Sequence, residues 1–169
     1  MRAAGVILAT VVALTLQTVL GRFLIGGTVA VDLVLVVVVY AALLSGPVTG
    51  LLTGTFAGLI QDYLSTGVVG IGALAKTLVG FIAGIIGTQF IVAQPLPRFV
   101  VFLGASLLHA TIFIGLYVLL GLWQLDAPYT AVLGQGTANA VVGVVAFQLA
   151  EFLPGAVERR RLTRPRLRR

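Results

Sequence analysis

The sequence predicts an all-α integral membrane protein that folds as a six-helix transmembrane bundle. Of its 169 residues, 59% are apolar and 9% are charged, whereas soluble domains are about 45–50% apolar and about 25% charged. The mean hydropathy is +1.13. So few charged side chains could not cover the surface of a soluble globule. Apolar runs of about 20 residues, the length that crosses a bilayer, recur between short breaks.

Six predicted spans fill most of the chain. They cover residues 5–24, 32–45, 47–65, 70–92, 99–122 and 129–153. Residues 1–153 therefore form a polytopic membrane domain, and residues 154–169 form a basic tail. The Val-rich run at 34–39 would favour a strand in water, but an isolated strand cannot satisfy its backbone in lipid, so we expect a helix. The first span is expected to be retained, because no small-residue cleavage pattern follows it.

The composition excludes several kinds of catalytic and metal site. The chain has no cysteine, which excludes disulfides, zinc–thiolate sites, iron–sulfur clusters and a Cys nucleophile, and its single histidine argues against a His-rich metal site. The stretch from Gly70 to Thr77 comes close to a phosphate-binding loop, but Ala75 replaces its second glycine. It also lies between two spans rather than after a strand of a soluble sheet. We expect no enzyme activity, no cofactor and no metal.

The basic residues predict the orientation of the chain. Seven arginines end the sequence, namely Arg159, Arg160, Arg161, Arg164, Arg166, Arg168 and Arg169. Since Lys and Arg flanking spans stay on the cytoplasmic side, the C-terminus is expected in the cytoplasm, and an even number of spans places the N-terminus there too. The tail could be a topogenic anchor, a site for anionic lipids or a docking site for an acidic cytoplasmic protein. The first two are favoured, and nucleic acid is not expected.

Glycines recur every four residues along two consecutive spans. In the third span the stripe precedes Asp62 and consists of Gly46, Gly50, Gly54 and Gly58. In the fourth span the stripe includes the position of Lys76 and consists of Gly72, Gly80 and Gly84. Small residues at this spacing let helix backbones approach closely in lipid. The two spans should therefore pack as an antiparallel hairpin. Packing within the chain is favoured over a seam for a separate protein, and both remain open.

Three charged residues are predicted to lie at a similar depth near the outer surface. Asp32 opens the second span, Asp62 ends the third, and Lys76 lies about 9 Å into the fourth from the same side. Pairing would offset the roughly 2.5–3.5 kcal/mol that each charge costs at a helix centre. We predict an intramembrane charge cluster of these three residues, which Arg22 could join. The alternative for Asp32 is a simple helix N-cap.

A second polar set lies deeper in the predicted bundle. His109 falls midway along the fifth span, and Gln135 and Asn139 lie four residues apart on the sixth. Each needs a hydrogen-bonding partner in hydrocarbon. Hydrogen bonds between helices are the favoured explanation, and a ligand pocket is the alternative.

Between residues 31 and 84 the chain carries several motifs that together resemble a known family. They are Val31-Asp32-Leu33, Gly46-Pro47-x-x-Gly50, Gly58-Leu59-Ile60-Gln61-Asp62 with Ser65-x-Gly67-x-x-Gly70, and Ala73-Leu74-Ala75-Lys76-Thr77-Leu78-Val79-Gly80. With these motifs, and with Asn139 in the last span, the chain resembles the rod shape-determining protein MreD family. Val31 replaces the proline that usually precedes the aspartate.

The resemblance implies a non-enzymatic scaffold of the bacterial cell-elongation complex in the inner membrane. It implies binding to MreC, a single-span protein, and action alongside MreB filaments, the glycosyltransferase RodA and a class B penicillin-binding protein in peptidoglycan synthesis. The family is similar in fold to the S components of energy-coupling-factor transporters. A small-molecule-binding S component of a vitamin transporter is therefore the alternative function.

Overall fold

The computed structural model describes residues 3–23, 31–65, 67–90, 94–122 and 129–162, and all of its regular structure is helical. Helix α1 spans Ala3–Phe23, α2 Leu33–Ser45, α3 Pro47–Leu64, α4 Ile71–Gln89, α5 Pro95–Leu119 and α6 Tyr129–Leu162. The all-α fold class is confirmed. Three described segments are long and apolar enough to cross a membrane, namely Ile71–Gln89, Pro95–Leu119 and Val132–Glu151. The crossing of the other helices stays a prediction.

Two helix boundaries differ from those expected by four residues or more. Helix α5 begins at Pro95, four residues before the expected start at 99, because proline is tolerated in a first turn whose N–H groups have no partner in the helix. Helix α6 runs to Leu162, nine residues beyond the expected end at 153. Pro154 and Gly155 come directly after the expected end and disfavour a helix, but Ala156 and residues 158–162 are strong helix formers, and the helix continues through them. Part of the predicted tail is therefore helical.

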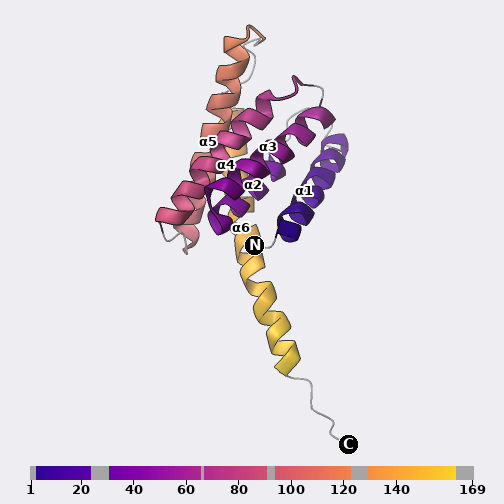
Figure 1. Ribbon diagram of the computed structural model, residues 1–169, viewed down its shortest axis with the longest axis vertical. Coiled ribbons are helices and arrows are strands. Elements are labelled where there is room, and N and C mark those ends of the chain that lie inside the picture. The colour runs from indigo at the N-terminus through magenta and orange to yellow at the C-terminus, as the bar shows by residue number, and fades with distance from the viewer. Residues whose placement is uncertain (1–2, 24–30, 66, 91–93, 123–128, 163–169) are drawn as a thin grey trace, which may run out of the picture.

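Helix α2 lies at the centre of the bundle and contacts all five other helices, while α3 and α4 form the most extensive helix pair (Figure 1). Helices α5 and α6 pair on one side, and α1 lies on the opposite side, against α2 and α3. One apolar cluster joins α2, α4, α5 and α6 around Leu35, Val79, Phe102 and Phe147. A smaller cluster joins α1, α2 and α3 around Leu14, Val38 and Ala57.

The glycine stripes face each other across the contact between α3 and α4. A Cβ atom added to Gly50 would meet the carbonyl oxygen of Gly80, and one added to Gly54 would meet the backbone of Lys76. The remaining close approaches are Gly58 against the backbone of Ala73, Gly84 against the backbone of Pro47, and Gly72 against the carboxylate of Asp62. In the described structure, the stripes are thus used for packing within the chain.

Gly46 has a different role from the other glycines of its stripe. It is the single residue between α2 and α3, with φ of 89°. That left-handed conformation is one that glycine adopts without steric cost. Gly46 therefore lets the chain reverse direction within one residue, and Pro47 then starts α3 in the first-turn position that suits proline.

Candidate functional site

A buried ion pair lies where α2 begins beside α4. The Lys76 Nζ atom is 2.8 Å from Asp32 Oδ2, and the exposed fractions of the two side chains are 4% and 6%. The other carboxylate oxygen, Oδ1, accepts a hydrogen bond from the backbone N–H of Leu35 at 3.0 Å. Asp32 therefore combines the two roles considered for it, since one oxygen caps α2 and the other pairs with Lys76.

His109 extends this pair to α5. Its Nε2 atom lies 3.2 Å from Lys76 Nζ. An ammonium group can only donate, so Nε2 must accept, and the imidazole is neutral with its proton on Nδ1. His109 stacks on Phe113, which contacts Tyr117 one turn further along. The Tyr117 hydroxyl accepts a 3.4 Å hydrogen bond from Val68 N in the connection between α3 and α4.

Asn139 ties α6 to the same site. Its Oδ1 accepts from the backbone N–H of Asp32 at 2.7 Å, and its Nδ2 donates to Ser106 Oγ of α5 at 3.1 Å. Only 1% of Asn139 is exposed. Members of both polar sets expected at different depths therefore form one network, which we call the polar network: Asp32, Gln61, Lys76, Ser106, His109 and Asn139.

Asp62 lies outside the polar network, so the expected three-residue charge cluster is divided. Its Oδ2 accepts from the backbone N–H groups of Gly70 at 2.9 Å and Ala73 at 3.0 Å. The physical reason is that α3 ends where α4 begins, and the unpaired N–H groups and positive dipole end of α4 attract the carboxylate. Asp62 thus closes the hairpin between α3 and α4, while Lys76 pairs with Asp32.

Several predicted residues do not join the network. Gln135 is half-buried on α6, one turn before Asn139, and forms none of the hydrogen bonds described above. Arg159, Arg160 and Arg161 lie on the last turns of α6, with side chains outside the described part. The side chain of Arg22 also lies outside it, as do Trp123 and the terminal residues Arg164, Arg166, Arg168 and Arg169.

Sequence reasoning missed two members of the network. Gln61 Nε2 donates to Asp32 Oδ1 at 3.4 Å, and Ser106 pairs with Asn139. The signal for Gln61 was its position directly before Asp62, in an otherwise apolar span. The signal for Ser106 was its spacing of three residues from His109, which places both on one face of a helix.

A second ion pair joins α5 and α6 at the opposite end of the bundle, and it was also missed. The Arg98 guanidinium, 5% exposed, donates to both carboxylate oxygens of Glu151. Its central carbon lies 4.1 Å from the centroid of the Phe147 ring, a cation–π contact. The signal was that Arg98 directly precedes the fifth predicted span and Glu151 lies near the end of the sixth. Two consecutive spans run in opposite directions, so these two positions fall at the same end of the bundle.

The network supports a prediction for Asn139. In Asn139→Leu, the buried N–H of Asp32 and the hydroxyl of Ser106 lose their partner, so the bundle should be destabilised by about 1–2 kcal/mol. Gln135→Leu on the same helix is the matched control and should change stability by less than about 0.5 kcal/mol. Thermal unfolding of the detergent-solubilised protein measures both. Equal destabilisation by the two variants would contradict the assigned role of Asn139.

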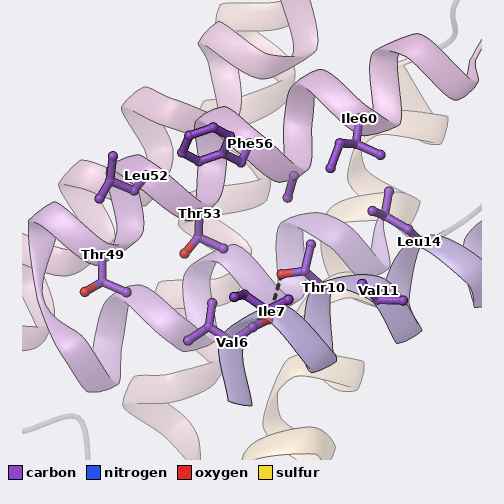
Figure 2. A pocket seen from close by; sticks show the side chains of 11 residues that line it. Val6, Ile7, Thr10, Val11, Leu14, Thr49, Leu52, Thr53, Phe56 and Ile60 are labelled. Atoms are coloured by element: carbon purple, nitrogen blue, oxygen red, sulfur yellow. Dashed lines mark hydrogen bonds between the residues drawn. The ribbon is translucent and has the colours of Figure 1, made fainter. Parts of the chain in front are cut away.

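A groove of about 550 Å³ opens between α1 and α3 (Figure 2). Large apolar side chains such as Ile7, Leu52 and Phe56 line it, together with the small side chains of Thr10 and Thr53. The Thr10 hydroxyl donates to the Val6 carbonyl of its own helix. No charged side chain lines this groove.

The described residues contain no group of three or more His, Asp or Glu side chains that could hold a metal ion. In the polar network, the carboxylate, the ammonium and the imidazole contact one another rather than lining the groove. This arrangement connects α2 to α6 by polar contacts inside the membrane domain, which is a structural role.

Comparison with known proteins identifies the family. A family model described as rod shape-determining protein MreD matches residues 2–152. Comparison with curated proteins and with solved structures gives no significant match. The similarity to S components of energy-coupling-factor transporters therefore stays a prediction. MreD proteins are membrane proteins that determine rod shape, and the match covers nearly the whole of this chain, which therefore belongs to the MreD family.

Proposed function

We propose that this protein is a non-enzymatic scaffold subunit of the bacterial cell-elongation complex. It would lie in the inner membrane with both termini in the cytoplasm, and support peptidoglycan synthesis together with MreB, RodA and a class B penicillin-binding protein. The family match to a rod shape-determining protein supports this role. The polar network supports a role without enzyme activity, because its charged groups neutralise one another in the interior of the bundle.

The proposed partner is a single-span protein like MreC, and its docking site is the groove between α1 and α3. A transmembrane helix packs by close van der Waals contact, and small residues let it approach the groove floor. The buried Thr53 provides such a floor beside Thr10, and the exposed side chains of Ile7 and Phe56 lie at the rim. Anionic lipids of the inner leaflet are the proposed contact of the arginines in the basic tail, residues 154–169.

This docking site predicts a selective effect of filling the groove. In Thr10→Trp, the indole would occupy the space of the incoming helix, so recovery of the MreC-like partner in a detergent pull-down should fall at least tenfold at equal expression. The control is Val141→Trp on α6, where Val141 is 50% exposed and lies outside the groove. Its recovery of the partner should stay within twofold of wild type.

Cell shape provides the second readout. Depletion of the protein should round the cells, and Thr10→Trp supplied in its place should fail to restore rods while Val141→Trp restores them. Normal rods after depletion would overturn the proposed scaffold function. Rods restored by Thr10→Trp, with full recovery of the partner, would overturn only the docking site.

A further inference from the structure

One hydroxyl group on the floor of the groove between α1 and α3 differs from its neighbours. Thr10 and Thr49, which also line the groove, donate to the carbonyl groups of Val6 and Ser45. Such a bond to the carbonyl four residues earlier is common for a threonine inside a helix. Thr53 forms no hydrogen bond within the described part of the chain, and its side chain points from α3 toward α1 (Figure 2). Its hydroxyl is therefore available to a molecule in the groove.

The Thr53 side chain lies at a depth where hydrocarbon surrounds the bundle. It follows Pro47, the first residue of α3, by six residues and precedes Leu64, the last, by eleven, which corresponds to about 9 Å and about 16 Å along the helix. In the predicted span 47–65, both helix ends lie near the headgroups, which places Thr53 in the hydrocarbon core. Thr53 is also only 9% exposed. Burial of an unpartnered hydroxyl is costly, and an acyl chain has no group that could bind it.

The chemistry of the groove limits what could bind this hydroxyl. The backbone N–H and C=O groups of a transmembrane helix bind each other, so a helix in the groove reaches Thr53 through a side chain. A charged side chain is costly in hydrocarbon, and none of the residues lining the groove carries a compensating charge. The uncharged side chains of Ser, Thr, Asn and Gln remain, and these form hydrogen bonds between membrane helices.

We propose that Thr53 is the hydrogen-bonding contact of the groove, and that the helix bound there carries a Ser, Thr, Asn or Gln at the depth of Thr53. This role of Thr53 rests on the proposed function, which places the membrane helix of a single-span partner in the groove. The apolar lining, including Ile7 and Phe56, can pack against any apolar helix face. Thr53 selects among such helices, because a helix without a polar side chain leaves the hydroxyl unpaired.

Thr53→Val tests the hydroxyl group, since valine retains the shape of the side chain. Recovery of the MreC-like partner in mild detergent should fall about threefold to tenfold at equal expression, as expected for one hydrogen bond between membrane helices. Thr53→Ser retains the hydroxyl and should stay within twofold of wild type. The matched control is Thr15→Val on α1, since Thr15 lies outside the groove and its hydroxyl donates to the Val11 carbonyl. It should also stay within twofold.

The stability of the protein without its partner distinguishes a binding role from a folding role. Because the Thr53 hydroxyl has no partner within the described structure, Thr53→Val should unfold at the same temperature as wild type or slightly higher. Thermal unfolding in detergent measures this. A clear loss of stability in Thr53→Val would assign the hydroxyl to the fold and overturn its role in binding.

The partner helix provides the closing experiment. Each Ser, Thr, Asn and Gln of its membrane span is replaced in turn by Ala, and one replacement should lower recovery as much as Thr53→Val does. Combining that replacement with Thr53→Val should cause no further loss. Losses that multiply, or the absence of any such position, would overturn the role of Thr53 while the docking groove stands. If the wild-type protein recovers no partner, the proposed docking site fails, and the role of Thr53 fails with it.

Discussion

Lys76→Met should destabilise the bundle by about 3–5 kcal/mol, because it removes one partner of a buried ion pair and leaves the other charge uncompensated. Asp32 is 4% exposed, and its Oδ2 atom has Lys76 as its ion-pair partner. The substitution retains much of the aliphatic length of the side chain, so the lost charge dominates the effect. His109 loses its hydrogen-bonding partner as well.

The measurement is unfolding of the detergent-solubilised protein by heat or by a denaturing detergent. A matched control is Thr111→Val on α5, since Thr111 is exposed and its hydroxyl donates only to the Leu107 carbonyl of its own helix. The control should change stability by less than about 0.5 kcal/mol. If Lys76→Met were as stable as this control, the ion pair would contribute nothing to the fold.

Gly50→Leu should have the second large effect, a destabilisation of about 3 kcal/mol or more, since overpacking at a rigid contact costs about 1–3 kcal/mol and more where the backbone must move. A Cβ at residue 50 would collide with the carbonyl group of Gly80, and backbone cannot rotate away as a side chain can. Helices α3 and α4 would have to separate, together with α2, which packs against both.

Gly104→Leu is the control for the size and flexibility of the added side chain. Nothing lies within 4 Å of the Cβ position of Gly104 on α5. Leucine also has the higher helix propensity, so this variant should be as stable as wild type or slightly more stable. Similar unfolding temperatures for Gly50→Leu and Gly104→Leu would contradict the close approach of α3 and α4.

The hairpin of α3 and α4 was predictable because it depends on local spacing alone. Glycines at intervals of four residues mark one face of a helix whatever surrounds it, and Gly46 with Pro47 marks the break before α3. The all-α class was predictable for the same reason, since lipid leaves the backbone few alternatives to a helix. The end of α6 was not predictable, because Pro154 and Gly155 mark a break after 153 whether or not the helix continues beyond them.

The partners within the polar network depend on packing that spacing does not encode. Asp32 and Asn139 are 107 positions apart, and their contact requires α2 and α6 to be neighbours. The similar depths of Asp62 and Lys76 in the membrane predicted that they lie near each other. The N–H groups at the start of α4 are closer to Asp62 in the sequence, and two of them bind its carboxylate instead. The groove between α1 and α3 depends on the angle between two helices, which their sequences do not specify.

A double-mutant cycle between Asp32 and Lys76 tests the polar network at its buried ion pair. Asp32→Asn keeps a side chain that can cap α2, and Lys76→Met removes the opposite charge. We expect the double variant to be more stable than the sum of the single effects by at least about 1.5 kcal/mol, since neither charge is then left alone. Additive effects within about 0.5 kcal/mol would show that the two charges do not stabilise each other, and would contradict the polar network as the structural centre of the bundle.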